Sequence, residues 1–187
     1  MKKITMILMS LLISVGAMAQ EKIQSSTTLP TNGVPEFLYT MKSGNNNYVG
    51  TETKYKSEKK GIFAFYSQGG NKYKIYDYSS QKWLTYASKS SYSSGKGFVT
   101  TTVDSNSANS FYINNYNYYY YEISPLKSGG SNQNIYLNYY EGAGANNSIS
   151  LGLWTDNGSK DAGSSWTFEL FATPVKELNK LSNNKNK

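Results

Sequence analysis

The chain has 187 residues, of which 19 are lysine and 12 are acidic, so its formal net charge is +7. Histidine, cysteine and arginine are all absent. Their absence excludes Ser-His-Asp and Cys-His catalysis, disulfide bonds, and zinc sites built from imidazole or thiolate. Readers of nucleic acid depend on arginine for bidentate contacts to bases and phosphates, so no nucleic-acid partner is expected.

The first 19 residues have the pattern of a secretory signal peptide. Two lysines open the chain, an apolar run follows over residues 4–15, and Ala17-Met18-Ala19 supplies a small-x-small cleavage site. A membrane anchor is the alternative, but the run is shorter than the roughly 20 residues that span a bilayer. The chain also lacks the cysteine of a lipoprotein and the disulfides common in secreted eukaryotic domains. We therefore expect a bacterial protein, secreted or periplasmic after cleavage near Ala19.

Beyond the signal, composition divides the chain into three parts. Residues 20–35 are polar, include two prolines and are predicted to form a linker. The folded domain is expected over residues 36–172, a length that can bury an adequate core. Pro174 ends the last strand, and residues 173–187 are predicted to form a short helix and a disordered tail.

A repeated unit is the main feature of this domain, and its clearest copy runs over residues 134–170. Three short apolar runs, 135–137, 151–154 and 166–168, are separated there by glycine, asparagine, serine and aspartate, as strands are by turns. Two weaker copies lie upstream, and each unit offers four short strands. The predicted closing aromatics of the three units follow matching prefixes, in Asn71-Lys72-Tyr73, Asn109-Ser110-Phe111 and Ser164-Ser165-Trp166.

Three units of four strands predict a β-trefoil, an all-β fold in which six strands form a barrel and six form a cap. A propeller needs at least about four blades, which three units cannot supply. Closure of the barrel removes the exposed strand edges that make sheet proteins aggregate. A β-sandwich or another small barrel is the alternative. The residues expected to fill the barrel are Ile62, Tyr73, Leu84, Val99, Phe111, Leu137, Leu151 and Trp166.

Several of these residues resemble the ricin B-type β-trefoil lectins, in which each repeat ends in a Gln-x-Trp signature. The likeness lies in the Tyr136-Leu137-Asn138 step, the strand over residues 151–154 and the Ser164-x-Trp166 ending. Asn109 stands in the place of the signature glutamine in the second repeat. The resemblance covers roughly residues 36–171, although none of the three repeats has a true Gln-x-Trp.

In that family, a repeat binds sugar through an acidic or amide residue after the second strand, an aromatic at the end of the third strand, and polar residues in the next loop. The resemblance implies such a site in the third repeat, with Asn138 as the hydrogen-bonding amide and Trp154 as the stacking platform. Asp156 and Asn157 would join from the loop, and Tyr66 is the aromatic that remains in the first repeat. The family's usual aspartate is absent, since the three repeats have Gly50, Thr85 and Asn138 there.

These residue types suit sugar on physical grounds as well. A sugar ring has an apolar C–H face that lies on an aromatic ring, while its hydroxyls pair with amides and carboxylates. Trp154 beside Asp156 and Asn157 offers both kinds of group. A half-buried position in the cap is the alternative for Trp154. The 18 tyrosines, four of them in a row at 118–121, fit either an exposed recognition surface or strand formation alone.

The sequence indicates a binding protein and not an enzyme. A glycosidase needs two facing carboxylates, and none of the 12 acidic residues sits in a recognisable motif. The stretch 156–161 resembles a calcium loop only loosely, because it lacks the alternating acids and the closing glutamate, and we predict a turn there. No metal or cofactor is expected.

Two functional classes remain open. The first is a secreted, monomeric, non-catalytic carbohydrate-binding protein that recognises glycans. The second is a protein-interaction trefoil, such as a protease inhibitor or an adhesive surface protein, that uses exposed loops and tyrosines.

Overall fold

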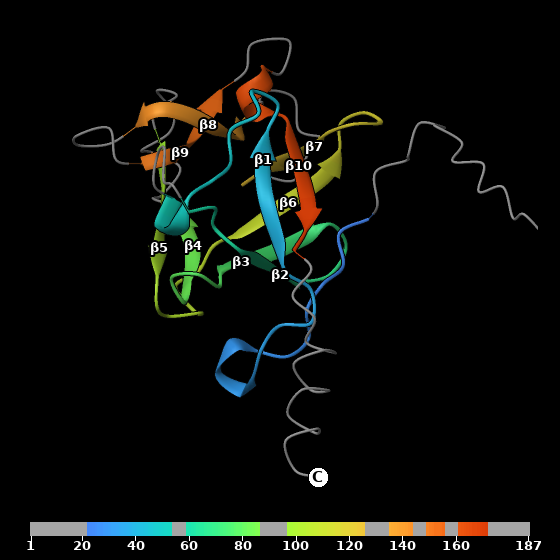
Figure 1. The fold of residues 1–187 in the computed structure, drawn as a ribbon, viewed down its shortest axis with the longest axis vertical. Coiled ribbons are helices and arrows are strands. Elements are labelled where there is room, and N and C mark those ends of the chain that lie inside the picture. The colour runs from blue at the N-terminus through green and yellow to red at the C-terminus, as the bar shows by residue number, and fades with distance from the viewer. Residues whose placement is uncertain are drawn as a thin grey trace, which may run out of the picture.

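The computed structural model describes residues 22–53, 59–86, 97–125, 135–143, 149–155 and 161–171. The signal peptide predicted over residues 1–19 and the tail predicted over residues 173–187 lie outside these ranges. Within them the chain forms ten strands and the short 3-10 turns η1 (Pro30–Asn32), η2 (Thr51–Thr53) and η5 (Ala162–Ser164) (Figure 1). The strands are β1 (Tyr39–Ser43), β2 (Phe63–Ser67), β3 (Lys72–Asp77), β4 (Lys82–Tyr86), β5 (Gly97–Thr102), β6 (Ser110–Asn115), β7 (Tyr121–Ser124), β8 (Ile135–Ala143), β9 (Ile149–Thr155) and β10 (Trp166–Leu170).

Six of the strands close into an antiparallel barrel. β1 pairs with β2, β2 with β3, β3 with β6, β6 with β7, β7 with β10, and β10 returns to β1. The β1–β10 pairing runs from Tyr39 opposite Leu170 to Ser43 opposite Trp166, and so joins the first strand to the last. Each barrel strand therefore has a neighbour on both sides, and closure protects its edges.

The barrel repeats one cross-strand pair three times. Tyr39 lies opposite Phe63, Tyr73 opposite Phe111, and Tyr121 opposite Trp166. In each pair a tyrosine near the start of a repeat's first strand meets an aromatic near the start of its closing strand. The closing aromatic of the first repeat is thus Phe63, and the sequence-based assignment of Tyr73 to that position is wrong. Tyr73 belongs to the opening strand of the second repeat.

The remaining strands form the cap. β4 pairs with β5 and β8 pairs with β9, and the two hairpins join through β5 and β9. In the described part of the first repeat, only two isolated bridges stand at the corresponding place, Lys42–Tyr48 and Gly50–Lys60. A closed six-stranded barrel with a cap built from three repeats is a β-trefoil, so the predicted fold is confirmed.

The barrel interior is a single cluster of buried apolar side chains. Seven of the predicted members belong to it, each 6% exposed or less: Tyr73, Leu84, Val99, Phe111, Leu137, Leu151 and Trp166. The prediction for Ile62 is wrong, because this residue is only half-buried and packs against a second cluster. The second cluster lies on the outer face of the barrel, where Ala64 and Tyr66 alternate along β2 with the inward-facing Phe63 and Phe65.

The segment before the barrel covers this outer cluster and is not the linker that the sequence predicted. Ile23 is 6% exposed and belongs to the main core. The Ser26 amide donates to the Phe65 carbonyl at 2.9 Å, and the Tyr66 hydroxyl donates to the Thr28 carbonyl at 3.0 Å. The folded part of the chain therefore begins well before Glu36, because the outer face of β2 is apolar and needs a cover.

Glu36 fastens the same segment through its carboxylate. The hydroxyls of Thr28 and Thr27 donate to its Oε1 at 2.6 and 2.8 Å, and the Thr27 amide donates to its Oε2 at 2.9 Å. These donors, the Thr28 hydroxyl foremost, lower the pKa of Glu36 to about 2. Hydrogen bonds to a carboxylate favour its charged form, so the charge and the docked conformation stabilise each other.

This clamp should release in acid. Because the pKa of Glu36 in the folded protein lies below its ordinary value of 4.5, the clamp stabilises the docked segment above that pH and is lost as the pH falls through about 2. In an NMR titration, the amide resonances of Thr27 and Thr28 should move with a midpoint near the lowered pKa of Glu36, about 2. The same resonances should show no such transition in Glu36→Gln. A midpoint near 4.5 in the wild type would contradict the clamp.

Candidate functional site

The third repeat presents an aromatic pair on the cap. Tyr136 of β8 and Trp154 of β9 lie directly opposite each other, and both are partly exposed. Residues directly opposite in an antiparallel pair project from the same face of the sheet. The sequence pointed to Trp154 alone. Tyr136 was missed as a site residue because only the strand pairing shows that it extends the same aromatic surface.

Asn138 lies two residues along β8 from Tyr136, on the same face, but it does not present its amide to solvent. It is 4% exposed, and its Nδ2 donates to Asp161 Oδ1 and to Ser164 Oγ, each at 2.9 Å. The predicted role of Asn138 as a direct sugar-binding group therefore needs correction. The turn over residues 161–164 covers the amide, and Asn138 anchors that turn to the hairpin.

Asp161 brings a carboxylate next to the Asn138 amide. The third repeat thus has an acidic group there, although its strand has Asn138 in place of the aspartate usual in the lectin family. The Asp161 side chain is exposed and caps η5, where its Oδ1 accepts the Ser164 amide at 2.8 Å. The same oxygen accepts from Asn138 Nδ2, which ties the carboxylate to the strand position two residues from Tyr136, on the face that Tyr136 and Trp154 share. The sequence showed Asp161 only as part of a turn, because its partner stands 23 residues earlier in the chain.

The second repeat contains a related link between the cap hairpin and the closing strand. Thr85 Oγ1 donates to Asn109 Oδ1 at 2.6 Å, and the Tyr86 amide donates to the same oxygen at 2.8 Å. Thr85 and Asn109 correspond to Asn138 and Ser164 in the alignment of the repeats. In both repeats, therefore, side chains at these two positions hydrogen-bond the cap hairpin to the residues just before the closing strand.

The other predicted site residues do not join the third-repeat cluster in the described structure. Tyr66 is 6% exposed and its ring packs against Trp83 at a centroid distance of 5.1 Å. Burial raises the pKa of its hydroxyl, so Tyr66 is a core residue, and its predicted contact with sugar is wrong. Asp156 and Asn157 lie outside the described residues, and their role stays a prediction.

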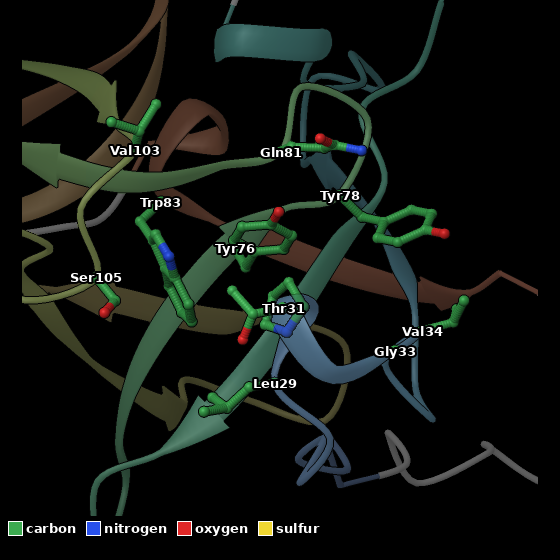
Figure 2. A pocket seen from close by; sticks show the side chains of 11 residues that line it. Leu29, Thr31, Gly33, Val34, Tyr76, Tyr78, Gln81, Trp83, Val103 and Ser105 are labelled. Atoms are coloured by element: carbon green, nitrogen blue, oxygen red, sulfur yellow. The ribbon is translucent and has the colours of Figure 1, made fainter.

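A pocket that the sequence did not indicate opens beside Trp83 (Figure 2). It has a volume of about 550 Å³. Its walls are the segment 29–34, the β3–β4 hairpin from Tyr76 to Trp83, and the loop at 103–105. We call it the N-terminal pocket. Sequence reasoning missed it because residues 20–35 were predicted to form a linker, and one wall comes from that segment.

The hairpin turn in this wall is held by a fully buried carboxylate. Asp77 accepts the amides of Glu52, Ser79 and Ser80 at 2.7, 3.0 and 3.3 Å, and the Ser80 hydroxyl at 2.8 Å. Burial raises the pKa of Asp77, while these four donors oppose the shift. The turn over residues 78–81 is therefore held by hydrogen bonds from inside the protein.

No group of three or more acidic side chains that could hold a metal ion was found among the described residues. Within the same ranges, no helix is long and apolar enough to cross a membrane.

Comparison with known proteins identifies the fold. No protein-family model and no curated protein sequence matches the chain. A ricin B-like lectin of Macrolepiota procera, solved in complex with lactose, superposes with a TM-score of 0.54 and 13% identity over 80% of this chain and 99% of that chain. The BEL β-trefoil, in an apo crystal form, superposes with a TM-score of 0.51 and 17% identity over 78% of this chain and 100% of that chain. The architecture resembles that of the ricin B-like trefoils.

Asn138 should not tolerate replacement by the aspartate usual in those lectins. In Asn138→Asp, a carboxylate oxygen would replace the amide that lies 2.9 Å from Asp161 Oδ1, and two donated hydrogen bonds would be lost. We expect destabilisation of about 1–3 kcal/mol at neutral pH in thermal unfolding. Two facing carboxylates repel until one binds a proton, so stability should recover as the pH falls. Asn138→Ala loses the same hydrogen bonds without adding charge, and its deficit should not shrink in acid. Equal pH profiles would contradict this account.

Proposed function

We propose that this protein is a secreted, non-catalytic, lectin-like module that binds glycans through its third repeat. The observation that supports the proposal is the partly exposed pair of Tyr136 and Trp154 beside the exposed carboxylate of Asp161. The fold likeness to a ricin B-like lectin is consistent with it. Secretion rests on the signal-like first 19 residues.

The arrangement matches what a sugar needs from a protein. The apolar face of a pyranose ring can lie across the two aromatic rings, which add contact area at low cost in side-chain entropy. The sugar hydroxyls then need a fixed acceptor at the edge of this platform. Asp161 supplies it, because its Oδ1 is tied to Asn138 and Ser164 and the carboxylate is held in place before the ligand arrives.

The role of Asp161 as acceptor can be separated from its role in the turn. Asp161→Asn keeps an Oδ1 that accepts from Ser164 and Asn138 but removes the charge, so the fold should be retained. A hydrogen bond to a charged group is stronger than a neutral one by roughly 1–1.5 kcal/mol, so the affinity for glycan should fall about tenfold. The measurement is a glycan array followed by titration of the ligands found.

The aromatic platform is tested on the same array. Trp154→Ala should weaken binding about 30-fold, the effect of losing roughly 2 kcal/mol at a central aromatic contact. Trp154→Phe keeps a ring and should lose less. Tyr118→Ala removes an exposed tyrosine elsewhere and serves as the matched control. Absence of any glycan ligand for the wild type, or binding untouched by Trp154→Ala, would rule out the proposed site.

Protein recognition is the second candidate, and the hairpin loop between β6 and β7 favours it. Tyr118 and Tyr119 are 75% and 65% exposed. The turn that presents them is ordered, since Asn117 Oδ1 accepts the amides of Tyr119 and Tyr120 at 2.8 and 2.9 Å. Rigidly held, exposed tyrosines are typical of surfaces that recognise proteins.

This candidate has a separate test. If the loop binds a protein, Tyr118→Ala with Tyr119→Ala should lose that partner while glycan binding and thermal stability stay unchanged, because both side chains project into solvent. Inhibition assays against a panel of proteases examine one form of the activity. A double variant indistinguishable from the wild type in protein capture and inhibition would eliminate the loop as the interaction surface.

A further inference from the structure

We propose that the N-terminal pocket is a second carbohydrate site and that it takes a neutral sugar residue. The pocket shares no lining residue with the cluster of Tyr136, Trp154 and Asp161. One of its walls, the segment 29–34, precedes the three repeats and has no counterpart in them. In Figure 1, η1 of that segment lies at the lower end of the molecule, while β8 and β9 lie at the upper end.

Aromatic rings form the floor of the pocket. Tyr76 and Trp83 lie opposite each other in the β3–β4 hairpin, with ring centroids 4.8 Å apart. Each is 6% exposed and is held from behind by the outer cluster, which includes Tyr66. These two rings therefore close the pocket from below and leave little ring area for a ligand to contact. The half-buried Tyr78 adds a third ring at the side of the pocket (Figure 2).

The rim is aliphatic and open to solvent. Leu29, Val34 and Val103 are 48%, 37% and 77% exposed, and all three line the pocket. Covering large aliphatic side chains on an exposed rim is favourable, because it removes apolar surface from water. The C–H face of a sugar ring can supply that cover. At about 550 Å³ the pocket falls within the size range of small-molecule sites.

The polar groups of the pocket are neutral hydrogen-bonding groups. Gln81 contributes an amide, and Thr31 and Ser105 contribute hydroxyls. Gln81 holds a left-handed backbone conformation with φ +58° in the turn that Asp77 fixes. An amide offers both donors and an acceptor, which is the complement of a row of sugar hydroxyls. The pocket thus combines rings, aliphatic contact and neutral polar groups within one opening.

Charge decides which sugars fit. The chain has a formal net charge of +7, yet every residue that lines the pocket is uncharged. A uronic or sialic acid would lose hydration on entry and would find no cation among the lining residues, which disfavours it. The Lys74 ammonium, which lies next to the lining residue Ser105, already donates to the Ser105 carbonyl at 2.7 Å. A neutral hexose meets only neutral partners. The lack of charge therefore selects neutral sugars and separates this pocket from the third-repeat site, which carries the Asp161 carboxylate.

Ligand-observed NMR by saturation transfer tests the pocket on the chain that follows the signal peptide. The probes are methyl glycosides of glucose, galactose and N-acetylglucosamine, with methyl glucuronide as the anionic comparison. Val103→Asp places a charge on the exposed rim, and Gln81→Gly removes the amide while relaxing the left-handed backbone. Each should weaken binding of a neutral glycoside about tenfold. Tyr118→Asp, which introduces the same charge on an exposed residue outside the pocket, should bind like the wild type.

The outcomes separate this pocket from the third-repeat site. If the two pocket variants bind a neutral glycoside more weakly and Trp154→Ala binds it as the wild type does, the result supports the pocket. It also counts against the third-repeat site for that sugar. Loss in Trp154→Ala alone overturns the pocket and leaves the third-repeat site standing. No binding of any neutral glycoside, or equal binding of methyl glucuronide, also overturns the proposal. Thermal unfolding of each variant shows that a loss of binding is not a loss of fold.

Discussion

The structure depends on the cross-strand pairs that close the barrel, in which Tyr39, Tyr73 and Tyr121 meet the closing strands. Tyr39 and Tyr73 make edge-to-face contacts with Phe65, and the Tyr121 ring packs at a tilted angle on Phe168. Phe65 touches Tyr39, Tyr73 and Phe168 at centroid distances of 5.6, 6.4 and 5.1 Å. These contacts join the first repeat to both of the others. Such pairs add about 0.5–1.5 kcal/mol each beyond their buried area, and here they do so in a chain that has no cysteine for disulfides.

Closure of the barrel also sets where the two proposed sites lie. Because β1 and β10 pair along their whole length, the first and last strands of the repeat region lie side by side, and the cap hairpins come from the segments between barrel strands. The β8–β9 hairpin carries Tyr136 and Trp154 on this rigid base. The segment before β1 has to leave the barrel along its outer face, where it covers Tyr66 and builds the N-terminal pocket. One architectural constraint thus positions both surfaces.

The sequence predicted the fold because buried residues recur in it at matching places. Leu84 and Leu137 mark the cap strands, and Phe111 and Trp166 mark the closing strands, so two of the three repeats could be aligned directly. The first repeat was misaligned for two reasons. The described part of its cap contains only bridges, and fewer residues separate this cap from the closing aromatic Phe63 than separate the corresponding positions of the other two repeats. The site was predicted less well. Alternation along a strand shows which residues share a face, but a segment from elsewhere in the chain decides whether that face is covered, as it does for Tyr66 and Asn138.

The residue before the buried leucine of each cap hairpin shows how the repeats have diverged. In the third repeat it is Tyr136, which lies opposite Trp154 and extends a partly exposed surface. In the second repeat it is Trp83, which lies opposite Thr102 and packs on the outer cluster at the floor of the N-terminal pocket. The same strand position thus faces different surroundings, one with a carboxylate and one lined by uncharged residues. Sites that share no residues are expected to respond independently to substitution, so the threefold fold can hold two binding surfaces of different selectivity without coupling them.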